Sequence, residues 1–276
     1  MTIRLIINAD DYGRTPDISR GIREAHLRGM VTSSTVMMNM HPAAGEVKIA
    51  LKETPDLGLG VHLVLTSGRS LLPAANIPSL VTATGSFHKL DQFVSLAPSL
   101  NVEDVKAEWR AQVEAFIAAA GKKPTHLDSH HHSSFFTPGL LRSMLELARE
   151  YGVPIRLPVA HSTGKIIDDL PEELNPPMLE FAPQLLEQFQ PSSPDAFFAS
   201  FYDDHATREE FLRILDILPK NGSFEIMCHP GYVDEAFAKE SGYAFQRQIE
   251  LEIVTDPAMR KEVERRGIQL ISFAHL

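Results

Sequence analysis

Short runs of β-branched and apolar residues alternate along the chain with longer segments whose apolar residues recur at helical spacing. This alternation is typical of repeated βα units, which build a parallel sheet. The predicted strands cover residues 3–9, 31–38, 57–65, 124–128, 154–157, 196–201, 223–228 and 268–273, and the predicted helices include residues 17–28, 102–120, 138–151, 207–218 and 257–266. This order predicts an α/β protein with a distorted (β/α) TIM-like barrel, and an open doubly wound sheet is the alternative.

Two long segments interrupt the alternation. Residues 66–100 are rich in Ser, Pro, Gly and Ala, and residues 158–194 contain many Pro and acidic residues with a helical pattern at 178–189. Loops of this length commonly form lids or binding walls, and solvated insertions are the alternative. Because no repeat or linker divides the chain, we predict a single domain over residues 1–276.

Charge and composition narrow the range of partners. The chain carries 26 Lys and Arg against 36 Asp and Glu, a net charge of −10, without a basic stripe, which argues against nucleic acid. No apolar run is long enough to span a membrane. The N-terminal MTIRLIINADDYG lacks the features of a signal peptide, so we expect a cytoplasmic protein. A homodimer is allowed only on general grounds, since homodimers are the commonest oligomers of soluble proteins.

The chain has 12 His and 1 Cys. A single Cys forms neither an intrachain disulfide nor a thiolate zinc site, whereas imidazoles bind metals and transfer protons near neutral pH. Any metal site is therefore expected to use His and carboxylate ligands. Motifs for a serine nucleophile elbow, a phosphate-binding loop, a dinucleotide site and an H-E-x-x-H helix are absent from the sequence.

The first candidate site is NADDYG, where the first predicted strand ends. Catalytic residues of parallel βα proteins gather at the carboxyl ends of strands, which places Asp10 and Asp11 where a site is expected. Strand alternation sends the two to opposite faces unless the chain bends between or just after them, and Gly13 permits such a bend. An ordinary turn is the alternative interpretation.

The second candidate is LGLGVHLVL, in which His62 shares one strand face with Gly58 and Gly60. The glycines leave room for a ligand beside His62. A buried structural histidine is the alternative.

The third candidate is PTHLDSHHH, at the end of another predicted strand. In extended geometry His126, Asp128, His130 and His132 share one face, which gives three imidazoles and a carboxylate at period two. This set suits Zn, Fe, Ni or Mn, and Mg if water completes the coordination shell. A surface run of histidines is the alternative.

Two further residues follow the same logic. His229 ends the strand in FEIMCHPG, where it is a fair general acid or base, or a histidine that only binds backbone. Arg156 lies inside a short apolar strand, where it could position a carboxylate or a substrate oxygen, or only pair with a structural acid.

Together NADDYG, GVHLVLTSG, HLDSHHH and EIMCHPG resemble the YdjC/ChbG-like carbohydrate deacetylases, which remove N-acetyl groups from sugars such as chitooligosaccharides. The motifs occur in family order over nearly the whole chain. The resemblance implies a distorted (β/α) barrel, Asp11, His62 and His130 as ligands of one divalent metal ion, and Asp10 as the catalytic base. His229 matches the late histidine of the family and Arg156 its strand arginine. The family often has a further His where this chain has Ser133 and Ser134, which bears on substrate contacts.

The leading hypothesis is therefore metal-dependent hydrolysis of an N-acetylated amino sugar with release of acetate, as in chitin degradation, using Mg²⁺ or Zn²⁺. Asp10 would activate water and His229 would protonate the amine. Asp128, Arg156 and His132 are expected to contact the substrate or to orient other site residues. The competing hypotheses are a glycosidase, a metal-dependent barrel phosphoesterase, and a catalytically silent sugar-binding or regulatory protein.

Overall fold

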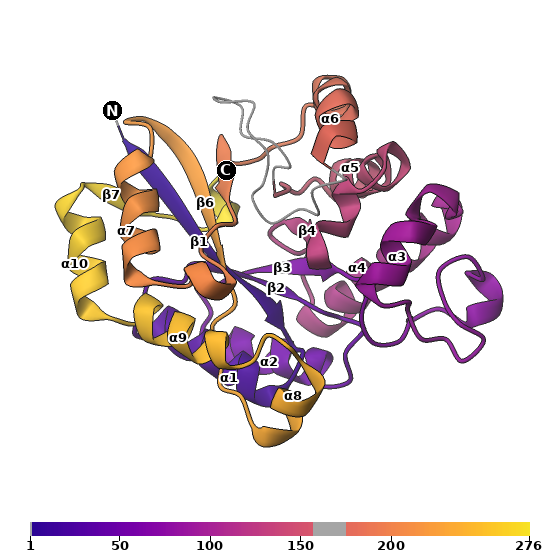
Figure 1. The fold of residues 1–276 in the computed structure, drawn as a ribbon, viewed down its shortest axis with the longest axis horizontal. Helices are drawn as coiled ribbons and strands as arrows, with labels where there is room; N and C mark the ends of the chain where they lie inside the picture. Colours follow the sequence, from indigo (N-terminus) through magenta and orange to yellow (C-terminus); the bar gives the residue numbers. More distant parts are fainter. Residues whose placement is uncertain (1, 157–174) are drawn as a thin grey trace.

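The chain is described here by a computed structural model, which places residues 2–156 and 175–276. In these residues, parallel strands form one curled sheet (Figure 1). The strands are β1 (Ile3–Tyr12), β2 (Ser33–Val36), β3 (Gly58–Leu63), β4 (Leu127–Ser129), β5 (Ala196–Phe198), β6 (Gly222–Cys228) and β7 (Ile268–Leu270). Their hydrogen-bonded order is β4-β3-β2-β1-β6-β5, and β7 pairs with the start of β1.

The sheet is a curled half-barrel with β4 and β5 at its two edges. After β4 the chain adds a bridge between Leu127 and Ile155, and β5 and β6 then return to the other edge of β1. The predicted α/β fold with a distorted barrel is confirmed, because the strands are parallel and the sheet curls into a half-barrel (Figure 1). The distortion has two visible sources: β7 pairs on the β2 side of β1 and does not separate β6 from β1, and β5 is only three residues long.

The predicted strand at 154–157 is the weakest match. Ile155 makes a single bridge and no extended ladder, and Leu157 lies outside the described residues. Ile155 N also donates to Ser192 O, just before β5. The segment therefore lies where a barrel strand is expected, but it has too few ladder bonds to count as one.

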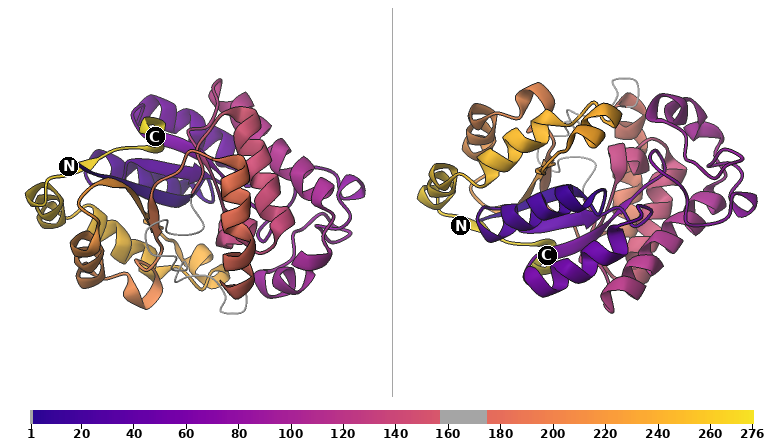
Figure 2. Two further views of the ribbon diagram at one scale, coloured as in Figure 1. Left: turned by 90° about the horizontal axis from the view of Figure 1, so that it is seen from above. Right: turned by 90° about the horizontal axis from the view of Figure 1, so that it is seen from below.

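Helices surround the curled sheet. Figure 2 shows α4–α6 on one side and α7 and α10 on the other. The helices are α1 (Pro16–Leu27), α2 (Ala43–Glu53), α3 (Leu90–Leu96), α4 (Val102–Ala120), α5 (Pro138–Tyr151), α6 (Asn175–Phe189), α7 (Arg208–Ile217), α8 (Glu235–Glu240), α9 (Phe245–Val254) and α10 (Pro257–Arg265). Of these, α2, α3, α8 and α9 are absent from the sequence-based prediction.

The helix ends carry local sequence signals. Thr15, Thr137 and Thr207 each accept a hydrogen bond from the third residue of the helix that follows, which satisfies one of the amide groups that an α-helix leaves unpaired. Gly121 and Gly152 end α4 and α5 in the left-handed region, with φ of +67° and +66°. These caps explain why the predicted bounds of α4 and α5 match the structure.

Residues 66–100 pack on the barrel as a small irregular unit. Two short 3₁₀ turns flank α3 within it, and Ile77, Leu80, Phe87 and Phe93 are buried against the main core. Its role as a lid stays a prediction. In the second segment, α6 occupies residues 175–189, and residues 158–174 lie outside the described part of the chain. Within the described residues, no helix combines the length and apolar character needed to cross a membrane.

Candidate metal centre and active site

The carboxyl end of β1 presents both aspartates to one site. The pairing of β1 with β2 shifts register between Ala9 and Tyr12, and Asp11 has a φ of +69°. A bulge with one residue in the left-handed region breaks the strict alternation of side chains. The bend permitted by sequence therefore falls at Asp11 itself, with Gly13 (φ +82°) continuing it. The result is that Asp10 and Asp11 line the same cavity.

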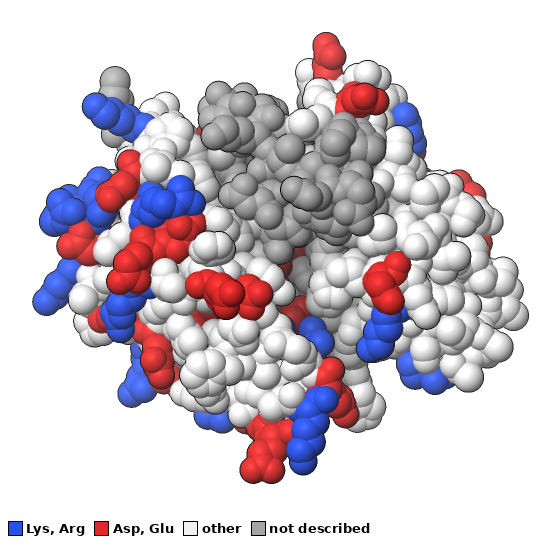
Figure 3. Space-filling view, in the orientation of Figure 1, with Lys and Arg blue, Asp and Glu red and all other residues white. Residues whose placement is uncertain are grey.

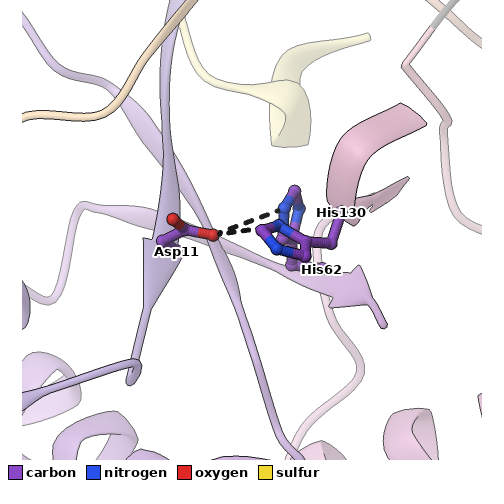
Figure 4. A group of neighbouring side chains, drawn as sticks. All are labelled: Asp11, His62 and His130. Atoms are coloured by element: carbon purple, nitrogen blue, oxygen red, sulfur yellow. Dashed lines mark ion pairs between the residues drawn. The ribbon is translucent and has the colours of Figure 1, made fainter. Parts of the chain in front are cut away.

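Asp11 meets two imidazoles from other strands. One of its oxygens, Oδ1, lies 3.7 Å from His62 Nε2 and 3.3 Å from His130 Nδ1. Figure 4 shows this carboxylate oxygen of β1 pointing at the ring of His62 on β3 and the ring of His130 after β4. All three side chains are buried. The structure thus brings together the three residues that the family resemblance implies as metal ligands.

Asp128 orients His62. The Nδ1–H of His62 donates to Asp128 Oδ1 at 2.7 Å, which leaves the lone pair of Nε2 facing Asp11. Thr35 Oγ1 donates to the other oxygen of Asp128 at 3.0 Å. Burial lowers the pKa of His62, but the charges of Asp128, Asp10 and Asp11 together with the hydrogen bond to Asp128 outweigh it, so the net shift is upward. Such a carboxylate fixes the ring tautomer and strengthens an imidazole as a ligand.

The histidine run does not keep strand geometry. β4 ends at Ser129, and a 3₁₀ segment (His130–Phe135) follows in which His131 and His132 have φ of +54° and +53°. The expectation of four side chains on one face is therefore wrong. His130 turns to Asp11, and burial lowers its pKa to about 4, which keeps its ring neutral and able to bind a metal. His132 packs its ring against Phe135 and Phe197 and lines the cavity.

His126 serves the core. Its ring stacks on Phe273 with centroids 3.7 Å apart, and Nε2 lies 3.1 Å from Asn8 Oδ1. A Cβ added to Gly60 would come within 2.5 Å of this ring. The room left by Gly60 therefore accommodates His126, and the expectation that this glycine makes space for a ligand is wrong.

Arg156 joins three buried carboxylates behind the cavity. It is fully buried, and its guanidinium lies 2.7 Å from both oxygens of Asp10, 3.0 Å from Asp128 Oδ2 and 2.9 Å from Glu225 Oε1. The guanidinium carbon of Arg156 lies over the ring of Phe197, 4.6 Å from the ring centroid. Arg156 and Asp128 thus contact site residues, and neither is among the residues that line the cavity.

Asp10 and Glu225 both contact Arg156, but their pKa values shift in opposite directions. Burial alone would raise the pKa of Asp10, but Arg156 and two nearby histidines lower it below its ordinary value, so Asp10 is ionised. For Glu225, burial dominates and raises the pKa to about 7. Asp10 therefore enters any reaction as a carboxylate.

His229 follows β6 and lines the cavity together with two tyrosines. Its ring lies 5.3 Å from Tyr202 and 5.5 Å from Tyr243, and these two tyrosines stack at 4.4 Å. The amide of His229 and the hydroxyl of Tyr243 both donate to Glu250 of α9. The backbone of His229 is thus held by the side chain of Glu250, which lies on a separate helix.

Sequence reasoning missed Arg247, Arg14 and the two tyrosines. Arg247 of α9 and Arg14 both donate to Asp11 Oδ2. Arg247 shares one face of α9 with Leu251 and Val254, at the spacing of buried helix positions. A charged residue within such an apolar stripe is the signal that could have identified it.

These residues enclose a cavity of about 400 Å³ at the carboxyl ends of the strands. Its lining includes Asp10, Asp11, His62 and His130 together with Tyr202, Tyr243 and His229. Figure 3 shows the molecule hollowed near the middle of this face, with acidic and basic side chains visible inside the hollow. On the left and lower parts of this view, charges of both signs are interspersed.

The donor set fits a divalent metal ion. Ligand atoms about 2.1 Å from one ion lie roughly 3.0–3.5 Å apart, close to the observed Asp11–histidine distances. Asp11 Oδ1 is buried and receives no hydrogen bond from the described residues, although such atoms are normally paired. Two imidazoles and one carboxylate are ligands typical of zinc and related metals. Asp11, His62 and His130 therefore form a cluster able to hold one ion.

Comparison with known proteins places the chain in a family. Residues 4–265 match the model of the YdjC-like proteins. The chain is 38% identical to a carbohydrate deacetylase of Brevibacillus brevis, covering 99% of this chain and 100% of the relative, and 34% identical to a chitooligosaccharide deacetylase of Yersinia enterocolitica, covering 98% of each. The fold matches a crystal structure from Enterococcus faecalis V583, of a protein with the provisional name cellobiose-phosphate cleavage protein, with a TM-score of 0.86, 34% identity and coverage of 100% and 99%.

The fold and the cluster define an α/β barrel with a candidate metal centre at the carboxyl ends of its strands. The chain belongs to the YdjC-like family, whose curated relatives named above are carbohydrate and chitooligosaccharide deacetylases.

Proposed function

We propose that this protein is a metal-dependent hydrolase that removes the N-acetyl group from an acetylated amino sugar of the chitooligosaccharide type and releases acetate. The observation that carries the proposal is the convergence of Asp11, His62 and His130 beside the ionised Asp10. The names of the family relatives support the choice of substrate.

Asp11 Oδ1, His62 Nε2 and His130 Nδ1 would hold the ion, with Mg²⁺ and Zn²⁺ as the proposed candidates. When bound, the ion would supply Lewis acidity for the acetyl oxygen and for the attacking water. The protein supplies the remaining groups, which line a cavity of about 400 Å³ that can hold a sugar amide.

Asp10 is the proposed general base. Its Oδ1 accepts hydrogen bonds from Asn8, Thr35 and Arg156, and its Oδ2 accepts one from Arg156 Nη1. Oδ2 thus retains a lone pair that can take a proton from water as the water oxygen bonds to the acetyl carbon. Arg156 fixes the carboxylate in position, at the cost of some basicity.

His229 is the proposed general acid. It stands at the cavity wall, where it can donate a proton to the amide nitrogen as the C–N bond breaks. Its backbone is anchored by Glu250 and Arg247, which limits movement of its ring. The products are acetate and the free amino sugar.

The rival reactions fit the geometry less well. A glycosidase needs a carboxylic acid of raised pKa beside the scissile bond, whereas arginines lower the pKa of both Asp10 and Asp11. A phosphoesterase with two metal ions needs a second site. The neighbouring group of Asp10, His62 and Asp128 shares His62 with the first site and is already paired with Arg156.

An acetate-release assay on N-acetylated sugars of increasing chain length tests the proposal. We expect acetate at unchanged chain length, loss of activity with a chelator, and recovery when a divalent ion is added back. His62→Ala should abolish the recovery, and His41→Ala, at an exposed position, should not. Shortened chains, or no acetate from any sugar with metal restored, would contradict the proposal.

A further inference from the structure

We propose that Arg247 is a positioning residue that holds Asp11 as a one-oxygen metal ligand and thereby sets the affinity of the site for its ion. This inference rests on the metal centre of the proposed function. It concerns a residue of α9 that lies 236 positions from Asp11 in the sequence.

The two oxygens of Asp11 have separate partners. Oδ1 faces His62 and His130, at 3.7 and 3.3 Å, and receives no hydrogen bond from the described residues. Oδ2 accepts from Arg247 Nη2 and, at 3.1 Å, from Arg14 Nη1. A carboxylate whose second oxygen is bound by two guanidinium groups can offer only its first oxygen to an ion.

Arg247 is itself held rigidly. Its side chain is 2% exposed, and its Nε donates to the carbonyl of Tyr243 at 3.2 Å and its Nη1 to the carbonyl of His229 at 3.5 Å. Its guanidinium also lies over the rings of Phe237 and Tyr243, at 5.6 and 5.5 Å. Because each nitrogen of the guanidinium has its own acceptor, the direction of Nη2 toward Asp11 is fixed.

Asp11 requires such support because its backbone is strained. A non-glycine residue at φ +69° persists only when its surroundings hold it there. Arg14 supports the same oxygen, but it lies three residues away on the same turn, and its side chain is 20% exposed. Arg247 is the deeply buried partner, and it links Asp11 to the segment between β6 and α9, which carries His229 and Tyr243.

Metal titration of Arg247 variants by calorimetry tests the proposal without relying on turnover. Loss of a group that orients a metal ligand typically weakens binding by about 10–100-fold, and we expect this loss for Arg247→Gln. Arg247→Lys keeps the charge but cannot serve the three acceptors together, so its affinity should fall between those of Arg247→Gln and the wild type. The matched control is Arg28→Met, which removes an arginine whose side chain is 75% exposed and should bind metal as the wild type does.

Circular dichroism and thermal unfolding without metal establish that each variant is folded. If Arg247→Gln does not fold, Arg247→Lys carries the test. A folded Lys or Gln variant with wild-type affinity, or a wild-type protein that binds no divalent ion, would overturn the inference. A wild-type protein that binds metal but releases no acetate would contradict the proposed function alone, provided the Arg247 variants still weaken binding.

Discussion

Arg156 donates hydrogen bonds to Asp10 from both terminal nitrogens of its guanidinium: Nη1 lies 2.7 Å from Oδ2, and Nη2 lies 2.7 Å from Oδ1. The two residues are 146 positions apart in the sequence, and both are buried. Such a bidentate pair fixes the carboxylate plane and keeps Asp10 ionised. The proposed base thus has a set orientation before any substrate enters the cavity.

Replacement of Asp10 by Asn tests its role as base. Asn keeps the shape of the side chain but cannot accept a proton from water, so acetate release should fall by about 10²–10⁴-fold while metal affinity is retained. The measurements are the rate of acetate release and a metal titration, and Asp17→Asn at a side chain 46% exposed is the control. Full activity of Asp10→Asn would favour a different base, or a different reaction.

Removal of Arg156 should be costly to folding. Arg156→Met leaves Asp10, Asp128 and Glu225 without their shared cation in a buried site, so we expect a loss of about 3–5 kcal/mol in the free energy of unfolding. Arg20→Met breaks an ion pair with Asp17 in which both side chains are about half exposed, and it should cost less than about 1 kcal/mol. Urea unfolding measures both. Equal effects of the two substitutions would show that the buried network contributes little to stability.

Asp128 should influence metal binding through His62. Asp128→Asn weakens the acceptor of the His62 Nδ1–H bond and permits the wrong ring tautomer, so metal affinity should fall by about 10–100-fold. Calorimetric titration measures the change. Asp216→Asn, at a side chain 63% exposed, is the control and should bind metal as the wild type does. Unchanged affinity in Asp128→Asn would mean that strand packing alone orients His62.

Glu250 makes stability depend on pH. Burial raises its pKa from 4.5 to about 8, so between these values the folded protein holds a proton that the unfolded chain has lost. The free energy of unfolding therefore falls as the pH rises through this window, by up to about 1.4 kcal/mol per pH unit for this group. Glu250→Gln removes the proton linkage and should flatten the slope, although Glu225 keeps its own share in both proteins.

Urea unfolding at several pH values within this window measures the slope. Glu252→Gln on the same helix, at an exposed position, should leave the slope unchanged. The assignment fails if Glu250→Gln and the wild type lose stability in parallel as the pH rises.

The periodic pattern of the chain is sufficient to predict the α/β class and many of its helices. The bounds of α4 and α5 follow from local signals, because Asn101 and Thr137 cap their starts and Gly121 and Gly152 their ends. Helices α2 and α9 are not predicted from the sequence, because charged and small residues interrupt their apolar stripes. Charged residues such as Arg247 are buried there only because partners elsewhere in the fold pair with them.

For the candidate site too, local sequence signals predict one part and contacts within the fold decide the other. Residue type and placement at strand ends point to Asp10, Asp11, His62, His229 and the PTHLDSHHH run, since the chemistry of a side chain and the end of an apolar run are both local properties. Within that run, only the family resemblance selects His130. The direction of each side chain is not local. A left-handed residue at Asp11 and two more at His131 and His132 break the alternation on which any strand-based assignment depends. Which histidine faces Asp11, which one packs in the core, and which arginine holds Asp11 are decided by contacts between segments up to 236 residues apart, and these contacts exist only once the barrel has formed.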